Sequence, residues 1–351
     1  MKMVKMKKLK LIRANKTKFG GAEVYLSRLS EQLIKMDIEH ELVFSNIPKI
    51  LPSWLRVILF NIQVCMDKKD DIYFSLERIS CPDIYRAGDG VHKVFLQVEK
   101  KSIFNPLHFV YVYLEKRTFN NSKKIIANSN MIKNQIIETY DINPEKIKVI
   151  YNGFTLEKVD YEKSYNNLNE EFSLYEQTNK KIFLYVGSGF KRKGVNEFLE
   201  ILSKLKNRNF IAFIIGKERK IKEYLSYAKE LNIFEQVIFT GPRTDVKDFY
   251  TISDIFLFPT RYEPFSNVVL EAMNYQNVVI TTKQNGASEI LDEEFTMKTS
   301  NDYSIVQKID KLLENDDRIE EIKKENLKIV QNFSIEKNVQ ETLEVINEII
   351  N

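Results

Sequence analysis

Two glutamates in the segment 261–272, RYEPFSNVVLEA, have a spacing that suits the binding of one extended ligand. Glu263 and Glu271 are separated by seven residues. At 100° per residue, a helix turns through about 800° over eight positions, so both carboxylates return to roughly the same side. The spacing therefore predicts that both contact one ligand. The alternative is that Glu263 caps the helix and Glu271 lies on a solvated face.

The same segment predicts an anion-binding helix start. It follows an apolar run at 255–258, and Pro264 is a residue type favoured in the first turn of a helix. The free amides of that turn, with the positive end of the helix behind them, suit a phosphate or sugar oxygens. These amides belong to Phe265, Ser266 and Asn267.

A basic pair lies in the segment 185–194, YVGSGFKRKG, after another apolar run. Arg192 and Lys193 directly precede Gly194, where we expect a helix to start. Their charges and the loop amides could converge on a diphosphate. Taken alone, the segment also fits an exposed basic turn.

Two further turns contain residue types that bind or react. Gly20 and Gly21, in FGGAE at 19–23, would let the backbone approach a ligand closely, although a glycine pair is also a common start to a helix. Asp89 and His92 lie in a glycine-bounded turn within 83–92, DIYRAGDGVH. Such a pair is either catalytic or merely solvated.

The elements that must position these residues alternate between strands and helices. Short apolar runs bounded by helical patterns are typical of strands buried on both faces of a parallel sheet. The predicted strands are 9–12, 41–44, 72–76, 124–127 and 147–151 in the first half, and 182–186, 210–215, 237–239, 255–258 and 278–280 in the second. A helical stripe follows the first strand: Ala22, Leu26, Leu29, Leu33 and Met36. Each half thus predicts a doubly wound α/β sheet.

This pattern predicts two domains and a crevice at the carboxyl ends of their strands, where ligands bind in open α/β sheets. The first domain is 1–157 and the second is 158–334, with a polar interdomain linker within 157–181. Three helical segments, 302–314, 316–331 and 335–350, end the chain without a further strand signal. We expect the helix 335–350 to pack back on the first domain.

Composition narrows the class of protein. Of the 351 residues, 43% are hydrophobic, a share that excludes a disordered chain. The formal net charge is only +4, so the chain has no large positive electrostatic field that would attract nucleic acid. No apolar stretch approaches the ~20 residues that span a bilayer, and the lysine-rich start does not resemble a signal peptide. Cys65 and Cys81 form at most one bridge and have no zinc spacing, which favours a reducing cytoplasm.

The motifs in this order resemble the family 4 retaining glycosyltransferases, which have the GT-B fold of two Rossmann-like domains facing a cleft. Glu263 and Glu271 match the two glutamates of the family signature, although its usual glycine after the first glutamate is Pro264 here. The similarity runs from about residue 8 to 291. Within the family, the chain resembles the lipopolysaccharide-core glucosyltransferases, which also have a serine at the position of Ser188.

The resemblance implies a role for each motif. The first domain would bind the acceptor and the second the nucleotide-sugar donor. Arg192 and Lys193 would neutralise the departing diphosphate, Glu263 would lie beside the donor sugar and Glu271 would hold the ribose. Either Asp89 or His92 would face the sugar. The remaining donor contacts would come from Gly20, Gly21, Ser188, Pro264, Phe265, Ser266 and Asn267.

The implied activity is retaining transfer of a hexose, with glucose expected, from a UDP-sugar to a lipopolysaccharide or lipooligosaccharide core acceptor. No Asp-x-Asp motif occurs, and a basic pair takes the place of a metal, so we expect transfer without a metal cofactor. Alternatives are transfer to another surface glycan, a GT-B nucleotide-sugar epimerase, or a basic membrane- or nucleic-acid-binding protein without enzyme activity.

Membrane contact is a further expectation. The segment 99–117, EKKSIFNPLHFVYVYLEKR, combines aromatic side chains with basic ones, as does an interface with an anionic bilayer. The resemblance implies a peripheral protein at the inner face of the cytoplasmic membrane, where a lipid-linked core oligosaccharide would be the acceptor. The lysine-rich amino terminus would add to that contact. The alternative for 99–117 is an ordinary helix packed on the sheet.

Overall fold

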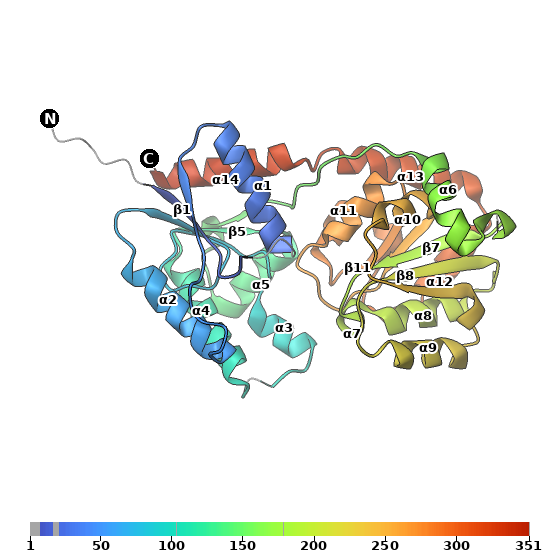
Figure 1. Ribbon diagram of the computed structural model, residues 1–351, viewed down its shortest axis with the longest axis horizontal. Coiled ribbons are helices and arrows are strands. Elements are labelled where there is room, and N and C mark those ends of the chain that lie inside the picture. The colour runs from blue at the N-terminus through green and yellow to red at the C-terminus, as the bar shows by residue number, and fades with distance from the viewer. Residues whose placement is uncertain (1–7, 17–20, 103, 178, 351) are drawn as a thin grey trace. The chain divides into compact units, whose positions relative to one another are not determined.

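The computed structural model describes residues 8–16, 21–102, 104–177 and 179–350, and the chain forms two compact units (Figure 1). Unit 1 comprises residues 1–153 together with 335–351, and unit 2 comprises 154–334. Each unit is built on one six-stranded sheet whose paired strands run parallel. The two sheets with their helices confirm the predicted α/β class.

Unit 1 has the strand order β2-β1-β3-β4-β5-β6. Its strands are β1 (Leu9–Ile12), β2 (His40–Val43), β3 (Ile72–Ser75), β4 (Ile84–Arg86), β5 (Lys124–Ala127) and β6 (Ile147–Val149). Its helices are α1 (Gly21–Lys35), α2 (Ser53–Met66), α3 (His92–Val98), α4 (Pro106–Asn121), α5 (Asn130–Tyr140), the 3-10 turn η1 (Pro144–Lys146) and α14 (Ile335–Ile350). The order reverses between β1 and β3, which are neighbours.

Unit 2 has the strand order β12-β11-β10-β7-β8-β9. Its strands are β7 (Lys181–Val186), β8 (Phe210–Ile215), β9 (Val237–Gly241), β10 (Ile255–Phe258), β11 (Val278–Thr282) and β12 (Thr296–Met297). Its helices are α6 (Tyr161–Phe172), α7 (Phe190–Lys193), α8 (Val195–Lys204), α9 (Ile221–Glu230), α10 (Val246–Ile252), α11 (Asn267–Asn274), α12 (Ile305–Leu313) and α13 (Asp316–Val330). Its 3-10 turns are η2 (Leu174–Gln177), η3 (Phe234–Gln236), η4 (Gly286–Ile290) and η5 (Glu293–Phe295).

The last helix belongs to unit 1. Figure 1 shows α14 beside α1, and Val339 and Leu343 of α14 join Leu29 and Leu33 of α1 in one buried cluster. The Lys124 ammonium pairs with the Glu348 carboxylate at 2.6 Å. The apolar stripe predicted for α1 is buried at Leu26, Leu29 and Leu33, whereas Met36 lies beyond the helix end and is exposed.

A disulfide joins Cys65 of α2 to Cys81, in the segment between β3 and β4. The two Cα atoms are 5.8 Å apart, within the range that a bridge requires. Because the two cysteines are paired, they give no support to a reducing compartment, where such bridges are rare. The cytoplasmic location stays a prediction that rests on the family resemblance.

Two local predictions need correction. The segment 157–181 is not a simple linker, because α6 and η2 form within it and the Ser164 hydroxyl of α6 donates to Asp248 Oδ1 of α10 at 2.8 Å. Strands β4 and β12 were not predicted, because they are only three and two residues long.

Among the described residues, no helix is both long and apolar enough to cross a bilayer.

Candidate active site

In unit 2, the loops after β7 and β10 lie at the point where the strand order reverses. These two strands are neighbours, yet the chain proceeds from β7 to β8 on one side and from β10 to β11 on the other. In open parallel sheets, loops that follow such strands separate and leave a ligand-binding crevice. The basic pair follows β7 and Glu263 follows β10, so the topology brings both motifs to the same edge.

The loop after β7 is held by one aromatic anchor and one glycine. Phe190, in the single turn α7, is 1% exposed and packs edge-on against the ring of Tyr185. Gly194 ends this turn with φ 82°, and a Cβ there would lie 1.9 Å from the carbonyl oxygen of Pro259. Only glycine combines this backbone conformation with so close an approach. The loop therefore packs tightly on the start of the loop that follows β10.

This packing places Arg192 and Lys193 against Glu263. Arg192 Nη1 donates to the carbonyl oxygen of Tyr262 at 2.6 Å and to Glu263 Oε2 at 2.9 Å. Lys193 Nζ is 3.8 Å from the same carboxylate oxygen. The side chains are 17–30% exposed, so all three are accessible to a ligand from solvent. Two cations and one carboxylate leave a local charge of +1, which suits an anionic group.

The helix start differs from the prediction. Helix α11 begins at Asn267 and has Ser266 as its N-cap residue, so Pro264 and Phe265 precede the helix. The Ser266 amide is not free, because it donates to Asn285 Oδ1 at 3.3 Å. Glu263 lies before the helix, as predicted, but four residues before its first residue, so helical rotation does not relate its side chain to that of Glu271. The local reason is that residues 263 and 285 pair as a short parallel bridge.

Asn285 holds this segment in place, and the sequence did not single it out as a site residue. It is fully buried; its Oδ1 also accepts from the Ala287 amide at 3.1 Å, and its Nδ2 donates to Thr281 Oγ1 at 3.1 Å. The Asn-Gly pair at 285–286, in the turn that follows β11, was the available signal, because asparagine side chains bond to backbone amides in turns. Asn285 therefore positions the chain around Glu263.

Glu271 lies in α11, where its Oε2 accepts from the hydroxyl of buried Tyr250 at 3.0 Å. Burial, and next the charge of Glu271, raise the pKa of Tyr250, so this phenol stays a hydrogen-bond donor. Ser188 lies in the loop after β7, and its Oγ accepts from the Lys217 amide at 3.0 Å. The structure thus connects Arg192, Lys193 and Glu263 directly, whereas Glu271 and Ser188 have other partners.

Unit 1 has its own polar cluster at its strand-order reversal. Arg13 directly follows β1 and Glu77 follows β3 two residues on, and their side chains pair at 3.0 Å. The same guanidinium pairs with Glu23 of α1 at 2.9 Å and lies 3.7 Å from Asp89. Burial alone would lower the pKa of Arg13, but these carboxylates outweigh it and raise that pKa. Arg13 was missed, although a charged residue directly after a buried strand was a usable signal.

Asp89 and His92 point to different surroundings. Asp89 lies beside Arg13 with its side chain 50% exposed. His92 begins α3, and its ring nitrogen Nε2 is 3.1 Å from Nδ1 of His108 in α4. Burial, followed by the positive charge of Arg78, lowers the pKa of His92 to about 3, so the ring is neutral near pH 7. Of the two, Asp89 presents the charged and more open group.

The remaining predicted site residues are the glycine pair. Gly20 lies outside the described residues, as does most of the lysine-rich start (1–7), and Gly21 is the first residue of α1. Within the described ranges, no three His, Cys, Asp or Glu side chains gather in a way that would hold a metal ion.

Two family models match the chain. Glycosyltransferase Family 4 matches residues 89–158, and Glycosyl transferases group 1 matches residues 166–329. The second match contains the loop after β7, the loop after β10 and the whole of α11. The first contains Asp89 and His92.

Curated relatives share part of their length with this chain. The capsular polysaccharide biosynthesis glycosyltransferase CapM of Staphylococcus aureus is 30% identical over 251 residues, which cover 68% of this chain and 64% of CapM. The lipopolysaccharide glucosyltransferase WaaG of Escherichia coli K12 is 26% identical over 212 residues, which cover 57% and 55%. The chain thus spans about half to two thirds of the length of the curated relatives it matches.

Solved structures confirm the fold. WaaG, a glycosyltransferase involved in lipopolysaccharide biosynthesis, superposes with a TM-score of 0.80 at 18% identity, covering 96% of this chain and 99% of WaaG. HepE of Anabaena, in complex with UDP and glucose, gives 0.73 at 19% identity and covers 97% and 100%. The predicted GT-B fold is therefore correct. The chain belongs to the family 4 glycosyltransferases.

Proposed function

We propose that this protein transfers a hexose, with glucose expected, from a UDP-sugar to a lipopolysaccharide or lipooligosaccharide core acceptor, with retention of anomeric configuration and without a metal cofactor. The observation that carries the proposal is the cluster of Arg192, Lys193 and Glu263 at the strand-order reversal of unit 2. The structures of HepE with UDP-glucose and of WaaG support the donor and the type of acceptor.

The basic pair would stabilise the leaving group. Glycosyl transfer builds positive charge on the sugar and negative charge on the departing diphosphate. Fixed cations aimed at that diphosphate lower the barrier most when they are already in place, because nothing then has to reorganise. Glu263 and the Tyr262 carbonyl both contact Nη1 of Arg192, and within the described chain its other N–H groups have no protein acceptor. Those groups would bind phosphate oxygens.

Carboxylates would position the sugars rather than attack them. Retention by front-face attack lets the leaving phosphate accept the proton of the acceptor hydroxyl, so no carboxylate nucleophile is needed. Glu263 would lie beside the donor sugar and Glu271 would hold the ribose hydroxyls. In unit 1, the half-exposed carboxylate of Asp89 is better placed to contact a sugar than the partly buried ring of His92, which contacts His108.

The test is release of UDP from UDP-glucose by the purified protein with a core oligosaccharide acceptor, with and without EDTA. We expect UDP release that requires the acceptor, an α-linked product and no effect of EDTA. An absolute requirement for Mg²⁺ or Mn²⁺, or an inverted product, would contradict the mechanism. A panel of nucleotide sugars in a thermal-shift assay would identify the donor.

Two alternatives share the same fold. Similarity to CapM favours transfer to another surface glycan as the second candidate, and replacing the core acceptor by capsular oligosaccharides tests it. An epimerase would instead convert the sugar of a UDP-hexose when no acceptor is present, whereas a transferase would only hydrolyse it slowly. A non-catalytic basic protein would do neither, and the basic pair beside Glu263 would then have no purpose.

The membrane contact would be made by one face of α4. Val110 and Leu114 are buried against unit 1, whereas Phe109 and Tyr113 are 63% and 52% exposed. Phe104, just before the helix, is 92% exposed. Aromatic rings flanked by basic side chains insert at the headgroup level of an anionic bilayer. This face would hold the protein at the cytoplasmic side of the membrane, near a lipid-linked acceptor.

Flotation with vesicles tests this contact. Wild-type protein should float with vesicles that contain phosphatidylglycerol and less with pure phosphatidylcholine. The double variant Phe109→Ala/Tyr113→Ala should lose most of this binding, whereas Tyr175→Ala, an equally exposed aromatic in unit 2, should keep it. Equal flotation of both variants would refute the assignment of the membrane contact to α4.

A further inference from the structure

A second pocket lies in unit 2 at the edge of the sheet opposite the candidate active site. It opens at the amino ends of β7 and β10, beside Ile182 and Asp254, whereas Arg192 and Glu263 follow the carboxyl ends of the same strands. Its volume is about 600 Å³, within the ~300–1,000 Å³ typical of small-molecule sites. None of the predicted donor or catalytic residues lines it.

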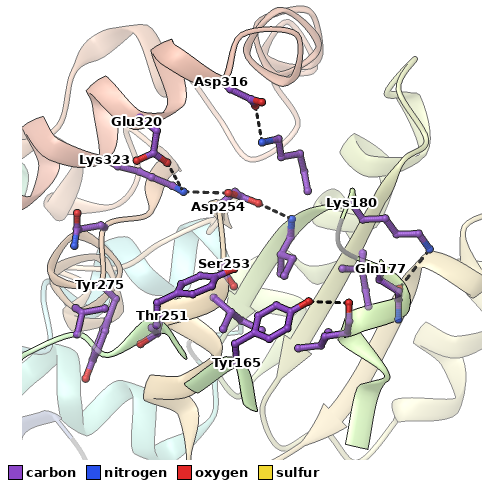
Figure 2. A pocket seen from close by; sticks show the side chains of 18 of the residues that line it. Tyr165, Gln177, Lys180, Thr251, Ser253, Asp254, Tyr275, Asp316, Glu320 and Lys323 are labelled. Carbon is purple, nitrogen blue, oxygen red and sulfur yellow. Dashed lines mark hydrogen bonds and ion pairs between the residues drawn. The ribbon is translucent and has the colours of Figure 1, made fainter. Parts of the chain in front are cut away.

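One side of this pocket is aromatic. Tyr161 and Tyr165 are four residues apart on α6, so they share a face of the helix, and their rings stack at 5.7 Å with 25° between their planes. Tyr275 lines the same space, and Figure 2 shows it with Tyr165 on one side of the pocket. Tyr161 is 53% exposed, so the core does not require its ring, and a large flat apolar surface remains open to solvent.

The other side of the pocket carries charges that cancel. Lys181 pairs with Asp316 at 2.6 Å, and Lys323 pairs with Asp254 and with Glu320, both at 3.0 Å. Figure 2 shows these contacts as dashed lines opposite the tyrosines. Together with Lys180, three lysines face three carboxylates, so the lining has no net charge. The pocket therefore has no field that favours a phosphate or nucleotide, unlike the cluster around Arg192.

The lining offers both donors and acceptors at short range. Carboxylates accept hydrogen bonds, and lysine ammonium groups and tyrosine hydroxyls donate them. Burial, and next the negative charge of Asp254, raise the pKa of Tyr161, so its phenol remains a donor near that carboxylate. A ligand that matches this lining must be neutral, carry several hydroxyl groups that both donate and accept, and have an apolar face.

We propose that this pocket is an accessory site for a neutral oligosaccharide of two or three sugars. The C–H face of one sugar ring would stack on the tyrosines of α6, and its hydroxyl groups would bond to the carboxylates and lysines opposite. This assignment is independent of the transfer reaction proposed above. It predicts that the protein holds a glycan chain at a place where no transfer occurs.

The test is saturation-transfer NMR on the full-length protein with saturating UDP, which keeps the donor site occupied. The probes are maltotriose, cellotriose and triacetylchitotriose at millimolar concentration. We expect at least one of them to bind wild-type protein. Tyr161→Ala should weaken that binding by about fivefold or more, and Tyr161→Phe, which keeps the ring, should retain it. Phe234→Ala, an exposed aromatic of unit 2 that does not line this pocket, should bind as wild type.

Three results would overturn this proposal: none of the probes binds, binding is unchanged in Tyr161→Ala, or inorganic phosphate displaces the sugar. Thermal melting of Tyr161→Ala shows whether the variant is folded, which we expect because the side chain is largely exposed. UDP binding measured in the same samples reports on the donor site. A failure of the proposed transfer reaction would therefore be distinguishable from a failure of the accessory site.

Discussion

Replacing Lys193 by alanine separates a role in catalysis from a role in folding. Its ammonium is 3.8 Å from Glu263 Oε2 and 5.4 Å from the ring centre of Phe258. Glu263 keeps its shorter contact with Arg192 at 2.9 Å, so the variant does not leave an unpaired carboxylate. A partly exposed ion pair contributes ~1 kcal/mol or less, and a cation–aromatic contact about 0.5–1 kcal/mol. We therefore expect the free energy of unfolding to fall by about 1–2 kcal/mol.

The expected effect on transfer is larger. A unit charge at the distance of this contact interacts with another by about 4 kcal/mol at an effective dielectric constant of ~20. Loss of one preorganised group that stabilises developing charge lowers the rate by about 10²–10³, or 2.7–4 kcal/mol. The charge on the diphosphate grows in the transition state, so the loss should appear mainly in kcat, with a smaller change in UDP affinity.

The assay combines UDP release, calorimetric binding of UDP and urea unfolding on the same preparations. Lys191→Ala is the matched control, because Lys191 lies in the same short helix but is exposed. It should leave all three measurements close to wild type. If the fraction of unfolded protein accounts for the whole loss of kcat in Lys193→Ala, the assignment of Lys193 to the leaving group is wrong. The same holds if Lys191→Ala has an equally low kcat.

Three further predictions concern stability. Gly194→Ala should destabilise the protein more than Gly189→Ala in urea unfolding. Both glycines have φ near 80°, a conformation that costs an L-residue about 1–2 kcal/mol, but only at Gly194 would the new Cβ collide with the backbone. Equal losses of stability in the two variants would refute the contact with Pro259. Arg13→Met should lower the free energy of unfolding by about 3–5 kcal/mol, because it leaves the largely buried carboxylate of Glu77 without its cation. The control Lys8→Met, which removes an exposed pair with Glu39, should lower it by less than about 1 kcal/mol. The pKa of His92, about 3, lies below its ordinary value of 6.5, so the unfolded chain binds an extra proton between these values and stability should fall as the pH drops below 6.5. His92→Gln should show a shallower fall in unfolding measured at pH 7 and pH 5, and an unchanged slope would contradict the low pKa.

Much of the fold was readable from local patterns, because buried parallel strands are apolar on both faces. The strand β8, with the sequence FIAFII, is buried at every position, and its boundaries match the prediction of 210–215. The prediction failed where a segment's apolar residues were few. Helix α6 was assigned to a polar linker, although Tyr161, Tyr165, Leu168 and Phe172 recur at helical spacing. The helix packs against α10, and this contact cannot be read from the sequence of α6 alone.

The candidate site shows the same division. The types and order of Arg192, Lys193 and Glu263 indicated a phosphate-binding motif, because the same motifs occur in this order in the family that the chain resembles. Their mutual contacts depend on β7 and β10 being neighbours, a pairing between segments about 70 residues apart. The sequence also predicted a helix from Pro264 with Glu263 just before it, but α11 begins only at Asn267, and residues 263 and 285 pair as a short bridge instead.

The sequence by itself determined the α/β class, the family resemblance and the residue types of the site, because periodicity and motif spacing are properties of nearby residues. Tertiary structure alone decided which charges meet. It placed Arg13 among Glu23, Glu77 and Asp89, turned the ring of His92 towards His108, and paired the charges in the pocket beneath Tyr161 and Tyr165. The physical reason is that an ion pair or hydrogen bond depends on distances of a few ångströms between atoms far apart in the chain, and only the packed sheets set those distances.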